Sequence, residues 1–303
     1  MMDRKDIILN AYKDSVSITH RHILSVINTT IIREKALNNS TTIKILDAGC
    51  GDGILIYFLH KYLHFFNPDK KFLIFGYDVI DHGVQESNYS QKTFSYLQAN
   101  APEIEWNERI KMIKSEENWP FENESFDIVV SNQVLEHVWN HDHFFKENHR
   151  VLSKTGFSVH LFPLKEILID GHVFLPKVHQ LKSWDAIYRK VKFYSKFGLG
   201  RYKTEKQNFN NDIIYFSKVW ADKMYHYCNY QTYPEISKVI KKNKLCFTTR
   251  FTSNYYLRKS REILGMKPDF YYKSYVSSKI AFYLFKYVSS ISLVLYKDEY
   301  SKY

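Results

Sequence analysis

The segment Ile45-Leu46-Asp47-Ala48-Gly49-Cys50-Gly51-Asp52-Gly53 is an apolar strand that runs directly into a glycine-rich turn, and an apolar helical pattern follows. Glycine lets the backbone approach a ligand closely, and the first turn of a helix offers amide groups without an intrahelical partner. Open α/β sheets bind ligands at the carboxyl ends of their strands. We therefore expect a nucleotide-like ligand here. The third glycine comes one residue earlier than in the dinucleotide pattern G-x-G-x-x-G, which argues against NAD.

Segments on both sides of this turn alternate between short apolar strands and helices. The first forty residues have helical spacing. Strands are then predicted at 43–46, 72–77, 110–113, 126–131 and 157–162, with helices at 55–65, 85–97 and 143–152 between them. A helix at 233–244, a strand at 246–257 and a last strand at 291–296 complete the pattern. This alternation predicts an α/β fold, a Rossmann-like, mostly parallel seven-stranded sheet with helices on both faces.

Residues 163–232 interrupt the alternation, because they are rich in Lys, Tyr and His and lack a strand rhythm. We predict a helical insertion after the fifth strand that acts as a substrate lid. The chain then divides into a cofactor-binding core with its N-terminal helix (1–162), the insertion (163–232) and the completion of the sheet (233–303). Residues 163–244 hold 16 Lys or Arg and 7 Asp or Glu, so most of the net charge of +11 lies there. Either an anionic partner or a basic solvated surface accounts for this charge.

The cysteines and the apolar segments bear on where the protein works. Cys50, Cys228 and Cys246 are widely spaced and form no CxxC pair, which favours a reducing compartment. The charged start does not have the pattern of a signal peptide, and no uncharged apolar run is long enough to span a membrane. Residues 275–296 are predicted as a core helix and the last strand, with peripheral contact to a membrane surface as the alternative. These features predict a cytoplasmic protein.

The segment 47–53 (DAGCGDG) resembles the first motif of class I S-adenosylmethionine-dependent methyltransferases. Four further segments resemble that family's landmarks in the same order, namely 72–78 (FLIFGYD), 119–131 (WPFENESFDIVVS), 134–138 (VLEHV) and 150–157 (RVLSKTGF). The resemblance covers residues 43–162. It implies that the cofactor is S-adenosyl-L-methionine.

The resemblance assigns Asp78 to the ribose hydroxyls, and a carboxylate suits this role because it accepts two hydrogen bonds from a vicinal diol. The family often has Asp at the end of the third strand to accept the adenine amino group. Here that position holds Ser115, followed by Glu116, so either residue is a candidate for the adenine contact. The full set of expected cofactor-binding residues is Asp47, Gly49, Cys50, Gly51, Gly53, Asp78, Val79, Ser115, Glu116, Ser131 and Asn132.

If the acceptor is a hydroxyl, a base must take its proton, and histidine suits this because its ordinary pKa lies near neutrality. His137 is the first candidate, because it follows the fourth strand. His172 and His179 compete with it, in a stretch (HVFLPKVH) similar to one that follows the fifth strand in some bacterial methyltransferases of the small-molecule and surface-glycan type. His137, His141 and His143 lie close together, but no further ligand completes a recognisable metal pattern. We therefore expect no metal.

Three classes of function remain compatible with the sequence. The first is O-methylation of a small molecule or glycan intermediate, favoured because the acceptor side carries a long insertion and lacks an Asn-Pro-Pro-Tyr-type motif. The second is an RNA methyltransferase that uses the basic, tyrosine-rich insertion to bind nucleic acid. The third is a non-catalytic protein that binds S-adenosylmethionine, which would be expected to have lost Asp47 or the glycines.

Overall fold

The computed structural model describes residues 4–81, 88–266, 269–272 and 279–298. It contains a seven-stranded sheet in the order β3-β2-β1-β4-β5-β7-β6. Its strands are β1 (Thr42–Ala48), β2 (Lys71–Val79), β3 (Ile110–Ile113), β4 (Phe126–Asn132), β5 (Leu152–Pro163), β6 (Leu245–Thr248) and β7 (Ser290–Lys297). The first five strands are parallel, whereas β7 runs antiparallel to both β5 and β6. The predicted α/β fold is confirmed.

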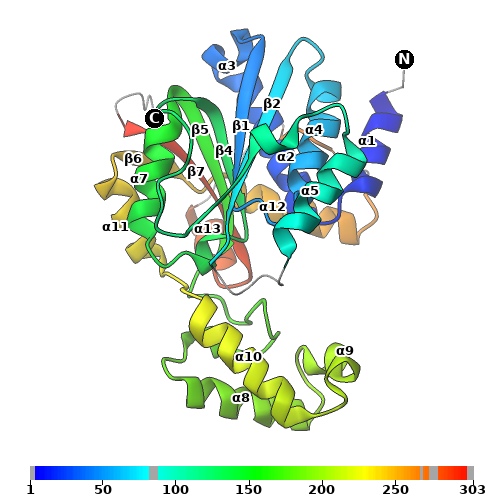
Figure 1. The fold of residues 1–303 in the computed structure, drawn as a ribbon, viewed down its shortest axis with the longest axis vertical. Coiled ribbons are helices and arrows are strands. Elements are labelled where there is room, and N and C mark those ends of the chain that lie inside the picture. The colour runs from blue at the N-terminus through cyan, green and yellow to red at the C-terminus, as the bar shows by residue number, and fades with distance from the viewer. Residues whose placement is uncertain (1–3, 82–87, 267–268, 273–278, 299–303) are drawn as a thin grey trace.

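Helices cover both faces of the sheet because its central strands are apolar on both sides (Figure 1). In β1, Ile43 and Ile45 pack into one core, and Leu46 and Ala48 pack into the other. The first core is covered by α1 (Arg4–Asp14), α2 (Ile18–Arg33), α3 (Lys35–Asn39), α4 (Ile54–Phe66), α5 (Tyr89–Asn100), α6 (Trp106–Arg109) and α12 (Phe251–Ile263). The second is covered by α7 (His141–Val151), α11 (Tyr233–Lys242) and α13 (Lys279–Phe285).

The strand predicted at 246–257 is wrong beyond its first residues. β6 ends at Thr248, and α12 begins at Phe251. Phe251 and Tyr255, one helical turn apart, are buried together with Tyr256 in the first core. The run of aromatic and hydroxyl side chains in this segment has a high strand propensity, but burial of this face against α2 and β7 overrides it.

The insertion after β5 is helical and has its own apolar core. It contains α8 (Trp184–Lys196), α9 (Tyr202–Glu205), α10 (Ile213–Tyr227) and the 3₁₀ turns η2 (Val178–Gln180) and η3 (Lys206–Phe209). Val191 on α8 and Phe216 on α10 are buried in this third core. Figure 1 shows the insertion beyond one end of the sheet. Since β5 leads into it, that end holds the carboxyl ends of the parallel strands.

The aromatic segment at 275–296 is partly outside the described residues. Where it is described, α13 precedes β7, and Phe282 of α13 is buried in the second core, as the sequence predicts. Within the described ranges, no helix is both long enough and apolar enough to cross a membrane.

Candidate active site

The glycine-rich turn after β1 has a conformation that favours glycine. Gly49, Gly51 and Gly53 have φ angles of +80°, +52° and +78°, in the left-handed region that other residues rarely adopt. A Cβ atom on Gly49 would also lie 2.6 Å from a methyl carbon of Val134. The backbone amides of Gly49 and Cys50 donate hydrogen bonds to the Tyr77 carbonyl, which ties the turn to the end of β2.

Asp78 holds this turn from the neighbouring strand. Its carboxylate accepts hydrogen bonds from the Gly51 amide at 2.5 Å and from the Val79 amide at 2.7 Å. The side chain is nearly buried and borders the pocket described next. A carboxylate in this position can accept hydrogen bonds from a vicinal diol.

A pocket of about 270 Å³ opens at the carboxyl ends of β1, β2 and β4. Many of the predicted cofactor residues line it, namely Gly49, Gly51, Asp78, Val79, Ser115, Glu116 and Asn132. Ser115 is fixed by Asp81, whose carboxylate accepts hydrogen bonds from its amide and hydroxyl. Glu116 accepts a hydrogen bond from the Asn140 side chain. The structure therefore brings most of the predicted set to one cavity.

The four other predicted cofactor residues, Asp47, Cys50, Gly53 and Ser131, do not line the pocket. Burial, together with the charges of Asp78 and Asp52, raises the pKa of Asp47 well above its usual range. The Cys50 side chain lies against Gly76, and Gly53 packs close to Leu97. The Ser131 hydroxyl lies in the core, 2.8 Å from His160 Nδ1.

Sequence reasoning missed several residues of the pocket wall, and most of them lie in the segment that follows β4. Those after β4 are Gln133, Val134, Val138, Trp139, Asn140, His143 and Phe144, and the others are Tyr77, Ile113 and Trp119. The side chain of Trp139 is exposed at this wall. The landmark VLEHV pointed to the segment, but it did not show which side chains turn toward the cavity. Gln133 has a φ angle of +58°, and that turn cannot be predicted from the residue type.

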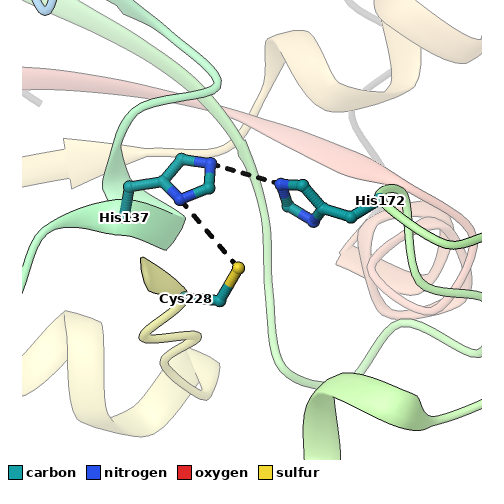
Figure 2. A group of neighbouring side chains, drawn as sticks. All are labelled: His137, His172 and Cys228. Atoms are coloured by element: carbon teal, nitrogen blue, oxygen red, sulfur yellow. Dashed lines mark hydrogen bonds between the residues drawn. The ribbon is translucent and has the colours of Figure 1, made fainter. Parts of the chain in front are cut away.

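His137 is the only one of the three predicted catalytic histidines that lines the described pocket. It belongs to a short 3₁₀ turn, η1 (Leu135–His137). Its Nδ1 lies 2.6 Å from the Tyr227 carbonyl oxygen, and its Nε2 lies 3.2 Å from Nε2 of His172. Figure 2 shows His172 facing one ring nitrogen of His137, with the Cys228 sulfur on the side of the other ring nitrogen, and the planes of the two imidazole rings are nearly perpendicular, at 83°.

His172 reaches the site from the loop after β5. Its Nδ1 lies 2.9 Å from the Tyr230 hydroxyl, which donates a hydrogen bond to the buried carboxylate of Asp170. Burial disfavours the charged imidazolium, but the nearby Asp170 carboxylate outweighs this effect and raises the pKa of His172. Asp170 also accepts hydrogen bonds from the backbone amides of His172 and Val173, which fix the loop.

His179 lies outside the pocket wall. Its side chain is fully buried, and Nε2 lies 3.0 Å from the Lys165 carbonyl oxygen. Burial lowers the pKa of His179 despite the neighbouring Asp170. A packing role therefore accounts for His179 better than proton transfer to a bound acceptor.

The histidines that lie close together in the sequence do not converge in space. His141 Nε2 contacts the Leu135 carbonyl in the interior, and His143 Nε2 contacts the Glu117 carbonyl. Neither joins the group that surrounds His137. The residues that do converge on His137 are His172, which is 35 positions away, and Cys228, which is 91 positions away.

The end of the insertion is attached directly to the wall of the pocket. The Asn229 amide donates a hydrogen bond to the Glu136 carbonyl at 2.6 Å, and its side chain donates to the Val138 carbonyl. The Glu136 side chain is buried, and burial raises its pKa to about 7. Movement of the insertion would therefore be transmitted to η1 and His137.

Comparison with known proteins is consistent with this geometry. Residues 46–160 match the family model described as a methyltransferase domain. No curated protein sequence matches the chain. The chain is similar to the structure of PKMT2 from Rickettsia typhi, with 14% identity, a TM-score of 0.50, and coverage of 93% of this chain and 53% of that chain. This likeness shows the fold.

Two other solved structures cover most of both chains. The YcgJ protein from Bacillus subtilis has 12% identity and a TM-score of 0.46, with 91% of this chain and 98% of that chain covered. An S-adenosylmethionine-dependent methyltransferase from Mesorhizobium loti has 12% identity and a TM-score of 0.43, with 84% and 91% covered.

Proposed function

We propose that this chain, a class I S-adenosylmethionine-dependent methyltransferase, transfers the methyl group to a hydroxyl of a small molecule or glycan intermediate. The family assignment rests on the methyltransferase domain at residues 46–160 and on the fold. S-adenosylmethionine is the methyl donor. The S–CH₃ bond of the sulfonium breaks as the new O–CH₃ bond forms, and the hydroxyl proton must leave the acceptor.

The observation that carries the choice of a hydroxyl acceptor is the position of His137. It lines the same pocket as Asp78 and the glycine turn, so a cofactor bound there would lie near an imidazole. A hydroxyl needs a partner that promotes loss of its proton, and histidine is the side chain most often used for this at neutral pH. We therefore place activation of the acceptor at His137, with His172 as its neighbour.

Residues 163–232 serve in this proposal as the lid over the acceptor. Three features support this role: the insertion leaves the sheet at the carboxyl end of β5, it has its own core, and it is attached to η1 through Asn229. A lid that excludes water and orients the acceptor suits methyl transfer, because the cofactor itself supplies the reactive group. The basic charge of the insertion favours an anionic acceptor.

An RNA acceptor is the second candidate, favoured by the exposed aromatic side chains on the basic insertion. Phe193, Phe197 and Tyr215 are more than half exposed and could stack on bases. A protein that contacts several phosphates loses affinity steeply as salt rises. A salt titration of binding to a short RNA therefore separates the two candidates, since a small-molecule enzyme should show weak binding without sequence or structure preference.

We also place the protein in the cytoplasm. The support is its cysteines, since Cys50, Cys228 and Cys246 are all free. Proteins of reducing compartments rarely carry disulfides, so unpaired thiols fit such a setting.

The proposal is tested by methyl transfer from methyl-labelled S-adenosylmethionine to fractions of a cell extract. We expect the label in a small-molecule or glycan fraction, in a form that resists both ribonuclease and mild alkali. An ether survives mild alkali, whereas a methyl ester releases methanol. Label that disappears with ribonuclease would instead support the RNA acceptor, and label released by alkali would exclude a hydroxyl acceptor.

A further inference from the structure

Three side chains from distant parts of the sequence converge at the edge of the pocket (Figure 2). His137 comes from η1, His172 from the loop after β5, and Cys228 from the end of α10. One nitrogen of each imidazole and the thiol sulfur all lie within 4.8 Å of one another. The two Nε2 atoms are 3.2 Å apart, and Cys228 Sγ is 4.0 Å from His137 Nδ1.

The hydrogen bonds on the far sides of the rings fix how the two histidines face each other. Nδ1 of His137 must carry a proton, because its partner at 2.6 Å is the Tyr227 carbonyl oxygen, which can only accept. The Tyr230 hydroxyl gives its proton to Asp170, so it accepts from Nδ1 of His172. In the neutral form of both rings, the two Nε2 lone pairs therefore point at one another.

Two lone pairs at this distance repel unless a cation lies between them. A bound proton can do this, but the surroundings resemble a metal centre more closely. Histidines that bind metals usually donate their other ring N–H to a backbone carbonyl or to a carboxylate network, as His137 and His172 do here. Zinc–nitrogen and zinc–sulfur bond lengths place tetrahedral ligand atoms about 3.4–3.6 Å apart, so the two nitrogens are already close to that spacing.

The charge around the group also favours a divalent cation. Two acidic side chains, Glu136 and Asp170, are buried beside it. One carboxylate oxygen of Glu136 is buried and has no hydrogen-bond partner among the described residues. A buried carboxylate without a partner is costly, and a nearby cation would offset that cost. The thiol of Cys228 adds a soft ligand, which favours zinc over magnesium or calcium.

We propose that His137, His172 and Cys228 bind a divalent cation of the zinc class, with the fourth coordination position open toward the pocket that His137 lines. Three protein ligands and one open position are typical of catalytic rather than structural zinc. This ligand set differs from the His137, His141 and His143 group considered from the sequence. Metal binding at this site does not depend on the identity of the acceptor.

The role of the cation in methyl transfer, unlike metal binding itself, rests on the proposed function. An acceptor hydroxyl that occupies the open position would have its pKa lowered by the cation, so it would lose its proton to solvent near neutral pH. The oxygen would then form the new bond to the methyl carbon as the sulfonium bond breaks. In this arrangement, His137 acts on the acceptor by holding the cation.

Cobalt(II) titration of the chelator-treated full chain under reducing conditions tests the site without cofactor or acceptor. We expect one equivalent to bind, with the visible bands of tetrahedral cobalt and a near-ultraviolet thiolate-to-cobalt band. Cys228→Ser should lose the thiolate band, and His172→Ala should lose the tetrahedral visible bands. Tyr230→Phe removes the hydroxyl that orients His172, so it should weaken affinity by about 10–100-fold, as for other supporting residues.

Cys246→Ser and His64→Ala serve as matched controls, because both residues lie outside the group, and they should titrate like the wild type. Melting curves show whether each variant is folded, and calorimetry with S-adenosylmethionine shows whether the cofactor site survives. Failure of wild-type protein to bind cobalt while it still binds the cofactor would overturn the metal site and leave the methyltransferase assignment intact. Cobalt absorption bands that persist unchanged in Cys228→Ser and His172→Ala would also overturn the metal site.

Discussion

The Nε2 atoms of His137 and His172 lie 3.2 Å apart, although the residues are 35 positions apart in the chain. Only His137 of this pair lines the described pocket. We therefore expect His137→Ala to lower the single-turnover rate of methyl transfer by about 10²–10⁴, the usual cost of removing a group that handles a proton. The measurement uses saturating cofactor and the labelled acceptor fraction.

Two other histidine variants serve as controls for that rate measurement. His179→Ala should mainly lower the melting temperature, because the side chain is buried and bound to a backbone carbonyl. His226→Ala, at an exposed position on α10, should change neither rate nor stability. Near-normal rates in both His137→Ala and His172→Ala would mean that proximity alone suffices and that neither histidine activates the acceptor.

Gly49→Ala should abolish or strongly weaken cofactor binding. Its Cβ would meet Val134 at 2.6 Å in a backbone conformation that already disfavours a side chain, so the turn has to shift. Gly265→Ala is the matched control, with a positive φ angle and open space around the position. The loss of stability in Gly265→Ala measures the cost of a side chain in the left-handed conformation alone, about 1–2 kcal/mol, without a steric contact. Equal losses of stability in the two variants, with normal cofactor binding, would show that contact with Val134 does not constrain the turn.

The buried Glu147 forms an ion pair with the partly exposed Arg150, and the pair orders the segment before β4. Glu147 accepts hydrogen bonds from Arg150 and from the Trp119 amide, and Arg150 donates to the Trp119 and Phe121 carbonyls. Glu147→Gln should lower the free energy of unfolding by roughly 1.5–3 kcal/mol, the scale of hydrogen bonds to charged groups. Urea denaturation measures this, with the exposed Glu122→Gln as control.

The Glu147–Arg150 pair should also make the free energy of unfolding depend on pH. Burial opposes ionisation, but Arg150 and the Trp119 amide outweigh it and lower the pKa of Glu147. A carboxyl group whose pKa is lowered in the folded state stabilises the fold at pH values above its ordinary pKa of about 4.3. This stabilisation is lost as the pH falls through the folded-state pKa. The stability gap between wild type and Glu147→Gln should therefore be full at neutral pH and shrink in acid. A gap that widens in acid would contradict the assigned shift.

Limited proteolysis tests the lid. Cleavage should begin between α8 and α10, where Phe197 and Leu199 are exposed around Gly198, and cofactor plus acceptor should slow it. The glycine turn after β1 should resist, because hydrogen bonds from Gly49 and Cys50 tie it to β2. First cleavage within residues 49–53 would contradict the proposed arrangement.

The sheet could be predicted from the sequence because its signal is local. Short apolar segments such as Ile43–Leu46 alternate with helical periodicity, and burial of both faces leaves few alternatives. The error at residues 249–257 has a physical cause. Phe251, Tyr255 and Tyr256 suit a strand by propensity, and only their packing against α2 and β7 selects the helix.

The pocket could be predicted only in part. Glycines at fixed spacing and an acid at the end of β2 are local signals, so Gly49, Gly51 and Asp78 were found. The convergence of His137, His172 and Cys228 depends on how the insertion returns to η1, and nothing in the local sequence specifies that return. Ser131 was predicted because it lies near the end of β4, but the Ser131 hydroxyl contacts His160 in the core and not the pocket.

The most direct test of the account is calorimetric titration of the folded chain with S-adenosylmethionine. We predict one site per chain in the wild type. Asp78→Ala should weaken binding by roughly 1.5–3 kcal/mol, the scale of hydrogen bonds to a charged group. Asp127→Ala, which removes a carboxylate bonded to the Lys44 amide near the amino ends of the strands, should bind normally. Absence of binding heat with folded wild-type protein, or equal affinities in the wild type and Asp78→Ala, would contradict the cofactor site.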